Sequence, residues 1–224
     1  MRIINAPQGS EAWLQARVGK ITASRFKDAR DRNKPAKGET IGKPSAKCYG
    51  YAAQVAVERI AARPVDKLFE SWQMREGSEQ EPHARHAYDL ETGNIVTEVG
   101  AIESDCGRFL YSPDGIIGDD GLLEIKTLLS PERILRIVGD GDLSDFIDQC
   151  IGGLWITGRK WIDLALWCPA LEPIGRDLTI HHIEREATAI AALESDLLAF
   201  ARLVDDNERL LRGAANADQL KVAA

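Results

Sequence analysis

The sequence has few cysteines, and they form no recognisable site. The four are scattered along the chain, with no C-x-x-C pair among them: Cys48, Cys106, Cys150 and Cys168. Dispersed cysteines of this kind are typical of reduced thiols, and they argue against a disulfide framework or a cysteine metal centre. We therefore expect a cytoplasmic protein.

Long apolar segments are also missing. The N-terminal stretch MRIINAPQGSEAW lacks the apolar region of a signal peptide, and no apolar run approaches the length of a membrane span. A G-x-x-x-x-G-K-[ST] motif is absent too, so ATP hydrolysis is not expected. With 224 residues, 44% hydrophobic and 28% charged, the composition is that of an ordinary globular protein, and we expect one domain over residues 1–224.

Charge is unevenly distributed. The net charge is −7, which at first argues against nucleic acid as a partner. Residues 1–50 nevertheless contain 11 Lys and Arg against 4 Asp and Glu, whereas the remaining residues contain 17 against 31. A basic N-terminal part could meet a phosphate backbone. The alternative is a solvated surface with no partner.

The most informative stretch is SPDGIIGDDGLLEIK, from Ser112 to Lys126. It predicts two strands joined by a turn at Gly118–Gly121, since Gly and Asp favour tight turns. The period of two places Glu124 and Lys126 on one face of the second strand. The hairpin brings Asp114 across from them, so two carboxylates and an ammonium are expected to converge.

These residue types suit metal-dependent phosphoryl chemistry. Carboxylates hold Mg²⁺, and the ion polarises a phosphoryl oxygen and activates a bound water. The alternative is an exposed hairpin with an ordinary Glu–Lys pair. The apolar context LLEIKTLL argues against that alternative, because burying Glu and Lys in such a strand is costly unless they are paired.

This stretch resembles the PD-(D/E)xK nuclease motif and, more closely, the phage lambda exonuclease/YqaJ-type alkaline exonucleases. Further stretches match that family in the same order: EAWLQARVGKITAS (11–24), REGSEQEPHAR (75–85) and QCIGGLWITGRKW (149–161). The resemblance runs from about residue 8 to the last helix. It implies an α/β fold of the PD-(D/E)xK restriction-endonuclease-like class, with a central mixed β-sheet flanked by helices.

The resemblance also implies an activity. Family members digest one strand of linear double-stranded DNA in the 5′→3′ direction, releasing 5′-mononucleotides and leaving 3′ single strands for recombination by strand annealing. The implied cofactor is Mg²⁺, with two ions per active site and Mn²⁺ as a substitute. The implied assembly is a homotrimer ring that threads linear DNA with 5′-phosphorylated ends and works with a single-strand-annealing protein. No membrane partner is expected.

The family's metal-site residues can be carried over where the motifs match. Asp114 and Glu124 would ligate the metal, with the Ile125 carbonyl as a further oxygen ligand. Glu81 would support a second metal. Lys126 would position or activate the attacking water. These residues are the expected catalytic and metal-binding set.

The Glu81 assignment rests on a pattern of Gly77, Glu81, Ala84 and Arg85, which matches the family. The residues alone favour a helix that Gly77 interrupts and that resumes at Glu81, with Pro82 in its first turn. An acidic residue in a first turn is ordinarily favoured by the helix dipole, which is the alternative role. Glu79 is a competing candidate if the register differs.

A second set of residues would hold the 5′-phosphate. A short helix is expected near Ala23, with Thr22 or Ser24 as its cap, and Arg17 lies close to this helix start. Taken alone, these are a surface arginine and an ordinary cap. The resemblance implies that Arg17 and Ser24 hold the terminal phosphate. It also implies that Ser112 contacts a phosphate and that Gln149 helps to hold the terminal phosphate and the catalytic water. The family's common Q-x-Q pattern is not kept, because Ile151 stands at its second position.

The remaining segments are expected as follows: a mobile basic loop at 31–47, a helix at 49–62, antiparallel strands at 95–102, 108–117 and 122–128, a helix at 145–156, strands at 160–168 and 178–183, and a helix from 184 to about 212. Residues 68–183 would be the nuclease core. His181 and His182 lack a Cys or His partner at ligand spacing and are interpreted as structural. Trp161 and Trp167 are interpreted as core residues, with stacking on DNA bases as the alternative.

Three other functions stay open. An endonuclease or junction resolvase could use the same fold, since fold does not fix function. A non-catalytic DNA-end-binding recombination protein is the second, although it would gain nothing from buried uncompensated carboxylates. A metal-dependent hydrolase acting on small phosphoesters is the third.

Overall fold

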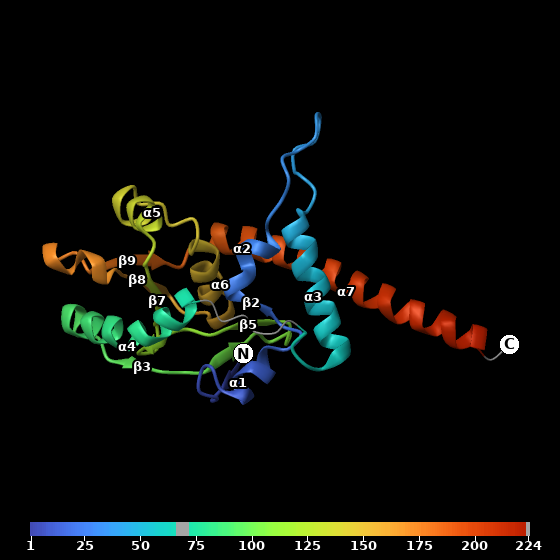
Figure 1. The fold of residues 1–224 in the computed structure, drawn as a ribbon, viewed down its shortest axis with the longest axis horizontal. Helices are drawn as coiled ribbons and strands as arrows, with labels where there is room; N and C mark the ends of the chain where they lie inside the picture. The colour runs from blue at the N-terminus through green and yellow to red at the C-terminus, as the bar shows by residue number, and fades with distance from the viewer. Residues whose placement is uncertain (66–71, 223–224) are drawn as a thin grey trace.

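The computed structural model describes residues 1–65 and 72–222, and two mixed β-sheets lie among its helices (Figure 1). The first sheet has the order β1-β4-β5-β2 and contains Arg2–Ile4, Ala101–Glu103, Phe109–Tyr111 and Ile21–Thr22. The second has the order β3-β6-β7-β8-β9 and contains Val96–Thr97, Gly115–Ile117, Gly121–Thr127, Trp161–Trp167 and Leu178–Glu184. The predicted α/β class with a mixed sheet flanked by helices is confirmed, but the strands are divided between two sheets.

Strand β7 is central to the second sheet. It pairs antiparallel with β6 and parallel with β8, and β8 pairs antiparallel with β9. Its residues alternate between two apolar layers. Leu122 belongs to the larger core, while Leu123 and Ile125 belong to a smaller cluster on the opposite face. The predicted period of two is therefore confirmed, and it places Glu124 and Lys126 on the same face as Leu122.

Two of the predicted strands are each broken. The expected strand 108–117 divides into β5 and β6, which lie in different sheets, and the expected strand 95–102 divides into β3 and β4. Pro113 explains the first break, because its nitrogen cannot donate to a strand ladder. The prediction of continuous strands was wrong here. The break places Ser112 and Asp114 where the chain passes from one sheet to the other.

The helices surround these sheets. Their bounds are α1 Glu11–Arg17, η1 Ala23–Arg25, α2 Phe26–Ala29, α3 Ala46–Ala61, α4 Trp72–Thr92, α5 Pro131–Ile134, α6 Ile147–Thr157, η3 Pro169–Ile174 and α7 Ala187–Val222, with a π-helical turn η2 at Leu135–Gly139. Helix α7 packs against α3 and α6, and α4 packs against β7, β8 and β9. None of the helices in the described ranges is long and apolar enough to cross a membrane.

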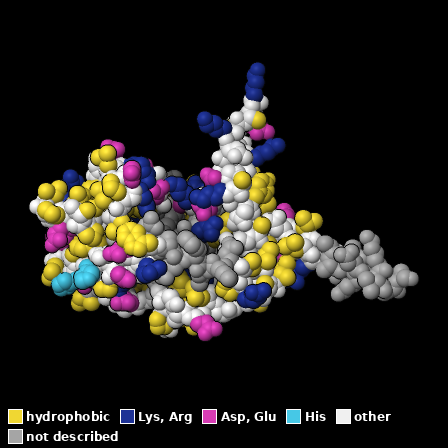
Figure 2. All heavy atoms as spheres, in the orientation of Figure 1, with side chains coloured by type: hydrophobic (Ala, Val, Ile, Leu, Met, Phe, Trp, Pro, Cys, Tyr) yellow, Lys and Arg dark blue, Asp and Glu magenta, His cyan; other side chains and the backbone are white. Residues whose placement is uncertain are grey.

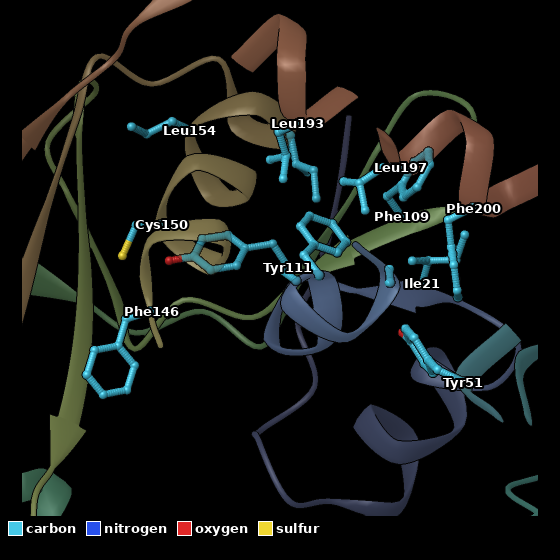
Figure 3. Packing of buried hydrophobic residues seen from close by; sticks show 14 of the residues in the cluster. Ile21, Tyr51, Phe109, Tyr111, Phe146, Cys150, Leu154, Leu193, Leu197 and Phe200 are labelled. Carbon is cyan, nitrogen blue, oxygen red and sulfur yellow. The ribbon is translucent and has the colours of Figure 1, made fainter. Parts of the chain in front are cut away.

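The larger core lies between the sheets, α3, α6 and α7. Figure 3 shows Phe109 and Tyr111 from β5 beside Leu193, Leu197 and Phe200 from α7. The ring of Tyr51 stacks on Phe200 with centroids 5.1 Å apart. The four cysteines, all within the described ranges, are free thiols, as predicted. Burial of this apolar surface holds β5 and α6 together, which fixes the residues that both elements present to β7.

Helix α4 differs from the prediction. It runs without interruption from Trp72 to Thr92, so Gly77 does not break it, and Pro82 lies inside it. Ala84 and Tyr88 are fully buried against the strand residues Leu123 and Ile125. That burial offsets the helix cost of Gly, which is about 1 kcal/mol relative to Ala. Glu81 therefore lies well inside a helix, and its alternative role as a first-turn residue is excluded.

The start of the nuclease core, placed near residue 68, falls outside the described residues.

Residues that were predicted to have structural roles can be checked by their contacts. His182 contacts Asp163 through Nδ1 at 2.6 Å, and Tyr88 donates to the same carboxylate at 2.5 Å. These contacts agree with the structural role predicted for His182. Trp161 and Trp167 pack partly buried against the smaller apolar cluster, in agreement with the predicted core role.

Residues 31–45 form a protruding segment, here called the arm (Figure 1). Its two sides pair through Asn33 N–H to the Lys43 carbonyl at 2.9 Å and Ser45 N–H to the Asp31 carbonyl at 3.0 Å. Figure 2 shows Lys and Arg side chains projecting from it into solvent. A segment with so little apolar surface packs poorly against a core, which explains why it stands away from the body.

Candidate active site

Glu124 is the centre of a cluster of charged and polar side chains around β7, here called the acidic cluster. Its members are Tyr111, Asp114, Glu124, Lys126 and Gln149. The side chain of Glu124 is only 1% exposed. One carboxylate oxygen accepts from Lys126 Nζ at 2.6 Å and from the Gln149 amide of α6. The other accepts from the Tyr111 hydroxyl at 2.9 Å. A buried carboxylate is stable only when its oxygens are paired, and these three donors supply the pairing.

Asp114 is the second carboxylate of the acidic cluster. Its N–H donates to the Leu123 carbonyl at 3.1 Å, and its carboxylate accepts from the Ile125 N–H at 2.5 Å. Burial raises the pKa of Asp114 well above its ordinary value, and the charge of Glu124 raises it further. The two carboxylates therefore repel each other in a site that holds more acid than base. This crowding is what a hard divalent cation would relieve.

Lys126 is the cation within this cluster. Burial lowers the pKa of its ammonium, but the carboxylates of Glu124 and Asp114 outweigh that effect, so the pKa is raised above its ordinary value. The side chain is therefore fully protonated at neutral pH. In this arrangement it acts through its positive charge.

Glu81 approaches the cluster from α4. Burial raises the pKa of its carboxyl, and the nearby charges of Glu98 and Glu124 contribute to the rise, whereas Arg85 opposes it. Arg85 forms ion pairs with both Glu81 and Glu98. The structure thus brings Glu81 near Asp114 and Glu124, as the sequence predicted, but with an arginine in contact.

A second cluster gathers around Ser112. The Ser112 hydroxyl accepts from Trp13 Nε1 at 3.0 Å, and Arg17 reaches both Ser112 and Ser24 at 3.5 Å, the long limit of a hydrogen bond. The guanidinium of Arg17 lies 4.3 Å from the centre of the Trp13 ring. Burial lowers the pKa of Arg17. The guanidinium nevertheless keeps its charge at neutral pH, because its ordinary pKa is far above 7. Such weakly bonded donors are available to an anion.

The start of the short helix beside this cluster differs from the prediction in one respect. The helical turn does begin at Ala23, after Thr22. Within the described chain, however, the Thr22 side chain makes no capping hydrogen bond. Its hydroxyl lies 3.5 Å from both the Ser24 and Tyr51 hydroxyls, and its N–H donates to Tyr51 at 2.9 Å. The tertiary contact with Tyr51 has replaced the local cap.

The two clusters are separate but adjacent, because Ser112 and Asp114 are two residues apart. A cavity of about 1320 Å³ opens beside them. It is bordered by the N-terminal segment 5–9, by Trp13, by one side of α4 that includes Glu81 and Arg85, and by Asp114. A ligand in this cavity could contact the acidic cluster and the ring of Trp13 together.

The predicted site residues are therefore brought together in two groups. The first group lies at one end of the β6–β7 hairpin and contains Asp114, Glu124, Ile125 and Lys126, with Gln149 of α6 in contact. The second group contains Arg17, Ser24 and Ser112. Gln149 contacts Glu124, and its predicted contact with a phosphate remains a prediction. Sequence reasoning missed Tyr111, Trp13 and Arg85 as site residues. The first two are apolar-pattern aromatics, and no pattern in one sequence marks such residues as hydrogen-bond donors to a site.

The donor set suits Mg²⁺, since it consists of carboxylates beside a backbone peptide. As arranged, no group of three acidic, His or Cys side chains in residues 1–65 and 72–222 stands ready as a metal site. Lys126 contacts one carboxylate oxygen of Glu124, and Arg85 contacts one of Glu81. Asp114, Glu124 and Glu81 would hold the ion once it replaced these contacts.

Comparisons with known proteins agree with this geometry. The structure is similar to an alkaline exonuclease (LHK-Exo) from Laribacter hongkongensis, with a TM-score of 0.77 and 34% identity over 93% of this chain and 100% of that chain. LHK-Exo in complex with dAMP gives a TM-score of 0.78 at the same identity and coverage. A phage-related exonuclease from Haemophilus somnus 129PT shares the fold, with a TM-score of 0.65 and 14% identity over 84% of this chain and 94% of that chain.

Among curated protein sequences, none matches this chain. A family model for the YqaJ-like viral recombinase domain matches residues 12–160, which include both clusters and the hairpin between them. The chain belongs to the YqaJ-like viral recombinase domain family.

Proposed function

We propose that this protein is a Mg²⁺-dependent 5′→3′ exonuclease that degrades one strand of linear double-stranded DNA to 5′-mononucleotides. The observation that carries the proposal is the convergence of Asp114, just before β6, with Glu124 and Lys126 of β7, next to the Arg17–Ser24–Ser112 cluster. The first group suits phosphodiester hydrolysis and the second suits a phosphate. The remaining 3′ strand would serve recombination by strand annealing.

The acidic group would hold the cofactor. Asp114 and Glu124 would bind one Mg²⁺ with the Ile125 carbonyl, and Glu81 would support a second ion, with Mn²⁺ as a substitute. A bound divalent cation supplies Lewis-acid polarisation of the phosphate and lowers the pKa of a coordinated water. Tyr111 and Gln149 orient the Glu124 carboxylate, which is otherwise free to turn about its own side chain.

Lys126 would act on the reacting phosphate. Its ammonium lies beside Glu124 and is fully protonated. We propose that it orients the attacking water by donating a hydrogen bond and stabilises the negative charge that grows on the phosphate.

The Ser112 cluster would set the polarity of digestion. A 5′-phosphate held by Arg17, Ser24 and Ser112 places the first phosphodiester near Asp114, because Ser112 and Asp114 lie on the same short segment. LHK-Exo, the similar protein, has been crystallised with dAMP, a nucleoside monophosphate. The homotrimer ring, the annealing partner and the one-domain organisation over 1–224 are proposals that rest on the family resemblance.

The polarity proposal predicts the behaviour of Arg17→Gln. We expect this variant to lose its preference for 5′-phosphorylated over 5′-hydroxyl ends, because a bidentate charged contact to phosphate is removed. Rates on the two ends, compared in the same assay, would measure the preference. Arg209→Gln on α7, which removes an exposed arginine far along the chain, is the control. An Arg17→Gln enzyme that still discriminated between the ends would show that the phosphate is held elsewhere.

The arm would contact the DNA backbone. It carries Lys34, Lys37 and Lys43 on an exposed segment. Replacing all three with Gln is expected to weaken duplex binding and to reduce the slope of log affinity against log salt by about 2.7, which is about 0.9 per lost phosphate contact. Titrations of labelled duplex at several salt concentrations would measure the slope. The control replaces Arg202, Arg209 and Arg212 of α7, and equal slopes for the two triple variants would refute the arm's role.

The proposed activity as a whole is tested by digestion of a linear duplex that is 5′-phosphorylated at one end. Release of mononucleotides from the phosphorylated strand supports it. Cleavage of a circular duplex would point instead to the endonuclease alternative.

A further inference from the structure

Arg85 occupies an unusual position beside the acidic cluster. It lies one helical turn after Glu81 on α4 and borders the cavity that Glu81 and Asp114 also line. Its side chain is 14% exposed, whereas that of Glu98 is 77% exposed and that of Glu81 is 33% exposed. A nearly buried guanidinium therefore links one carboxylate inside the cavity to another at its outer rim.

The contacts of Arg85 divide between these two carboxylates. One terminal nitrogen pairs with Glu81, and the other pairs with Glu98. The Nε–H is buried and has no hydrogen-bond partner among the described residues. A buried arginine with a purely structural role is expected to donate a hydrogen bond from its Nε–H as well. The guanidinium is thus held by its two ends, and either end can be released without losing the other.

The helix on which Arg85 lies is firmly placed. Ala84 and Tyr88, its neighbours along α4, are fully buried against the β7–β8 layer. The α4 backbone is thus held in place at this point, and Arg85 and Glu81 can change contacts by rotation of their side chains. Because α4 stays in position, a change of partner by Arg85 changes the charge around Glu81 without moving the backbone.

We propose that Arg85 is a built-in counterion that a divalent cation must displace from Glu81, and that Arg85 stays paired with Glu98 when it is displaced. The inference rests on the proposed function, in that it takes Glu81 as part of the metal site. Arg85 is a positioning residue here, since it acts on the metal through Glu81. Its role is to neutralise Glu81 before the cation arrives and to release it afterwards.

The proposal predicts how two substitutions change the affinity for a divalent cation. Arg85→Gln removes a competing positive charge, so Glu81 and Glu98 attract a divalent cation more strongly, and we expect Mn²⁺ to bind about tenfold more tightly. Glu98→Gln removes the second partner of Arg85, so the guanidinium stays on Glu81, and we expect Mn²⁺ to bind about threefold more weakly, a smaller effect because Glu98 is exposed to solvent screening. If Glu98 acts through Arg85, Glu98→Gln should have little effect on Mn²⁺ binding once Arg85 is replaced by Gln, whereas a direct charge effect of Glu98 would persist in the double variant.

The test is Mn²⁺ binding to the full-length protein without DNA, measured by electron paramagnetic resonance of the free ion. The measurement is made at a pH of about 8.5, well above the ordinary pKa of a carboxyl group. Arg85→Lys retains the charge but cannot bridge both carboxylates as a fork does, and it is expected to bind Mn²⁺ nearly as the wild type does. Arg212→Gln is the matched control, because Arg212 pairs with Glu208 at the same i,i+4 spacing on α7.

Several outcomes would overturn the proposal. Unchanged or weaker Mn²⁺ binding by Arg85→Gln would do so, as would tighter binding by Glu98→Gln. If Arg85→Gln does not fold, the exposed Glu98→Gln variant still decides by its sign. Asp114→Asn separates the two levels of inference: if it loses Mn²⁺ while the Arg85 and Glu98 variants behave as wild type, only the counterion role fails. If Asp114→Asn binds Mn²⁺ normally, the proposed metal site itself is wrong.

Discussion

Lys126→Ala is expected to reduce DNA cleavage by about 10²–10³-fold, the usual cost of removing one preorganised charge from a reaction that builds negative charge. The ammonium lies 2.6 Å from Glu124 and carries the positive charge of the acidic cluster. Duplex binding should be almost unchanged, because the arm and the Ser112 cluster remain. Single-turnover cleavage and end-binding titrations on the same duplex would separate the two effects.

Lys160→Ala is the matched control for this variant. Lys160 is an exposed lysine that pairs with Asp120 at the turn of the same hairpin, away from Glu124. It should cleave at the wild-type rate. Near-normal cleavage by Lys126→Ala would remove Lys126 from the mechanism and would favour the interpretation of the Glu–Lys pair as an ordinary structural contact.

Asp114→Asn is the second substitution with a large expected effect. It should lower the rate of cleavage and raise the stability of the metal-free protein. Cleavage in Mg²⁺ is expected to fall by about 10³-fold or more, because a neutral amide is a poor ligand for a hard cation. The metal-free protein should become more stable. Burial and the charge of Glu124 raise the pKa of Asp114, so its ionised form disfavours folding at neutral pH, and an amide removes that charge.

The stability change can be measured by thermal unfolding without metal. Asn can still accept the Ile125 N–H that Asp114 accepts at 2.5 Å, so the hairpin should keep its hydrogen bond. A gain of about 1 kcal/mol would raise the unfolding midpoint by roughly 2–4 °C for a chain of this size. Asp119→Asn, at an exposed turn position, is the control. Full Mg²⁺-dependent activity in Asp114→Asn would mean that the metal is held elsewhere.

The sequence was most informative where local pattern and tertiary structure agree. The period of two along β7 correctly placed Glu124 and Lys126 on one face, and the turn at Gly118–Gly121 correctly brought Asp114 opposite Glu124. Both features depend only on strand geometry and turn chemistry. The fold class followed from the family resemblance that these residues carry, and the comparisons confirm it.

Other features depend on contacts that a single sequence does not reveal. The chain between Phe109 and Ile117 is apolar enough to suggest one strand, yet it divides at Pro113, and β5 and β6 pair with partners in different sheets that the sequence does not identify. Gly77 suggested a helix break, yet burial of Ala84 and Tyr88 keeps α4 whole. In α4, packing outweighed a local preference of about 1 kcal/mol.

The site residues that were missed have the same explanation. Tyr111 alternates as an ordinary core residue of β5, and only the approach of β7 brings its hydroxyl to Glu124. Arg85 matched a family pattern, but its link from Glu81 to Glu98 joins α4 to the segment between β3 and β4. Donors and counterions of this kind become visible only when distant segments are placed together.

The measurement that tests the central proposal most directly is digestion, in Mg²⁺, of an internally labelled linear duplex that is 5′-phosphorylated at one end only. We predict release of 5′-mononucleotides from the phosphorylated strand, an intact complementary strand, and an untouched circular duplex in the same reaction. Cleavage of the circle, or digestion that begins at the 3′ end, would contradict the proposal. Tight end binding without any cleavage would contradict it too, and would support a DNA-end-binding protein instead.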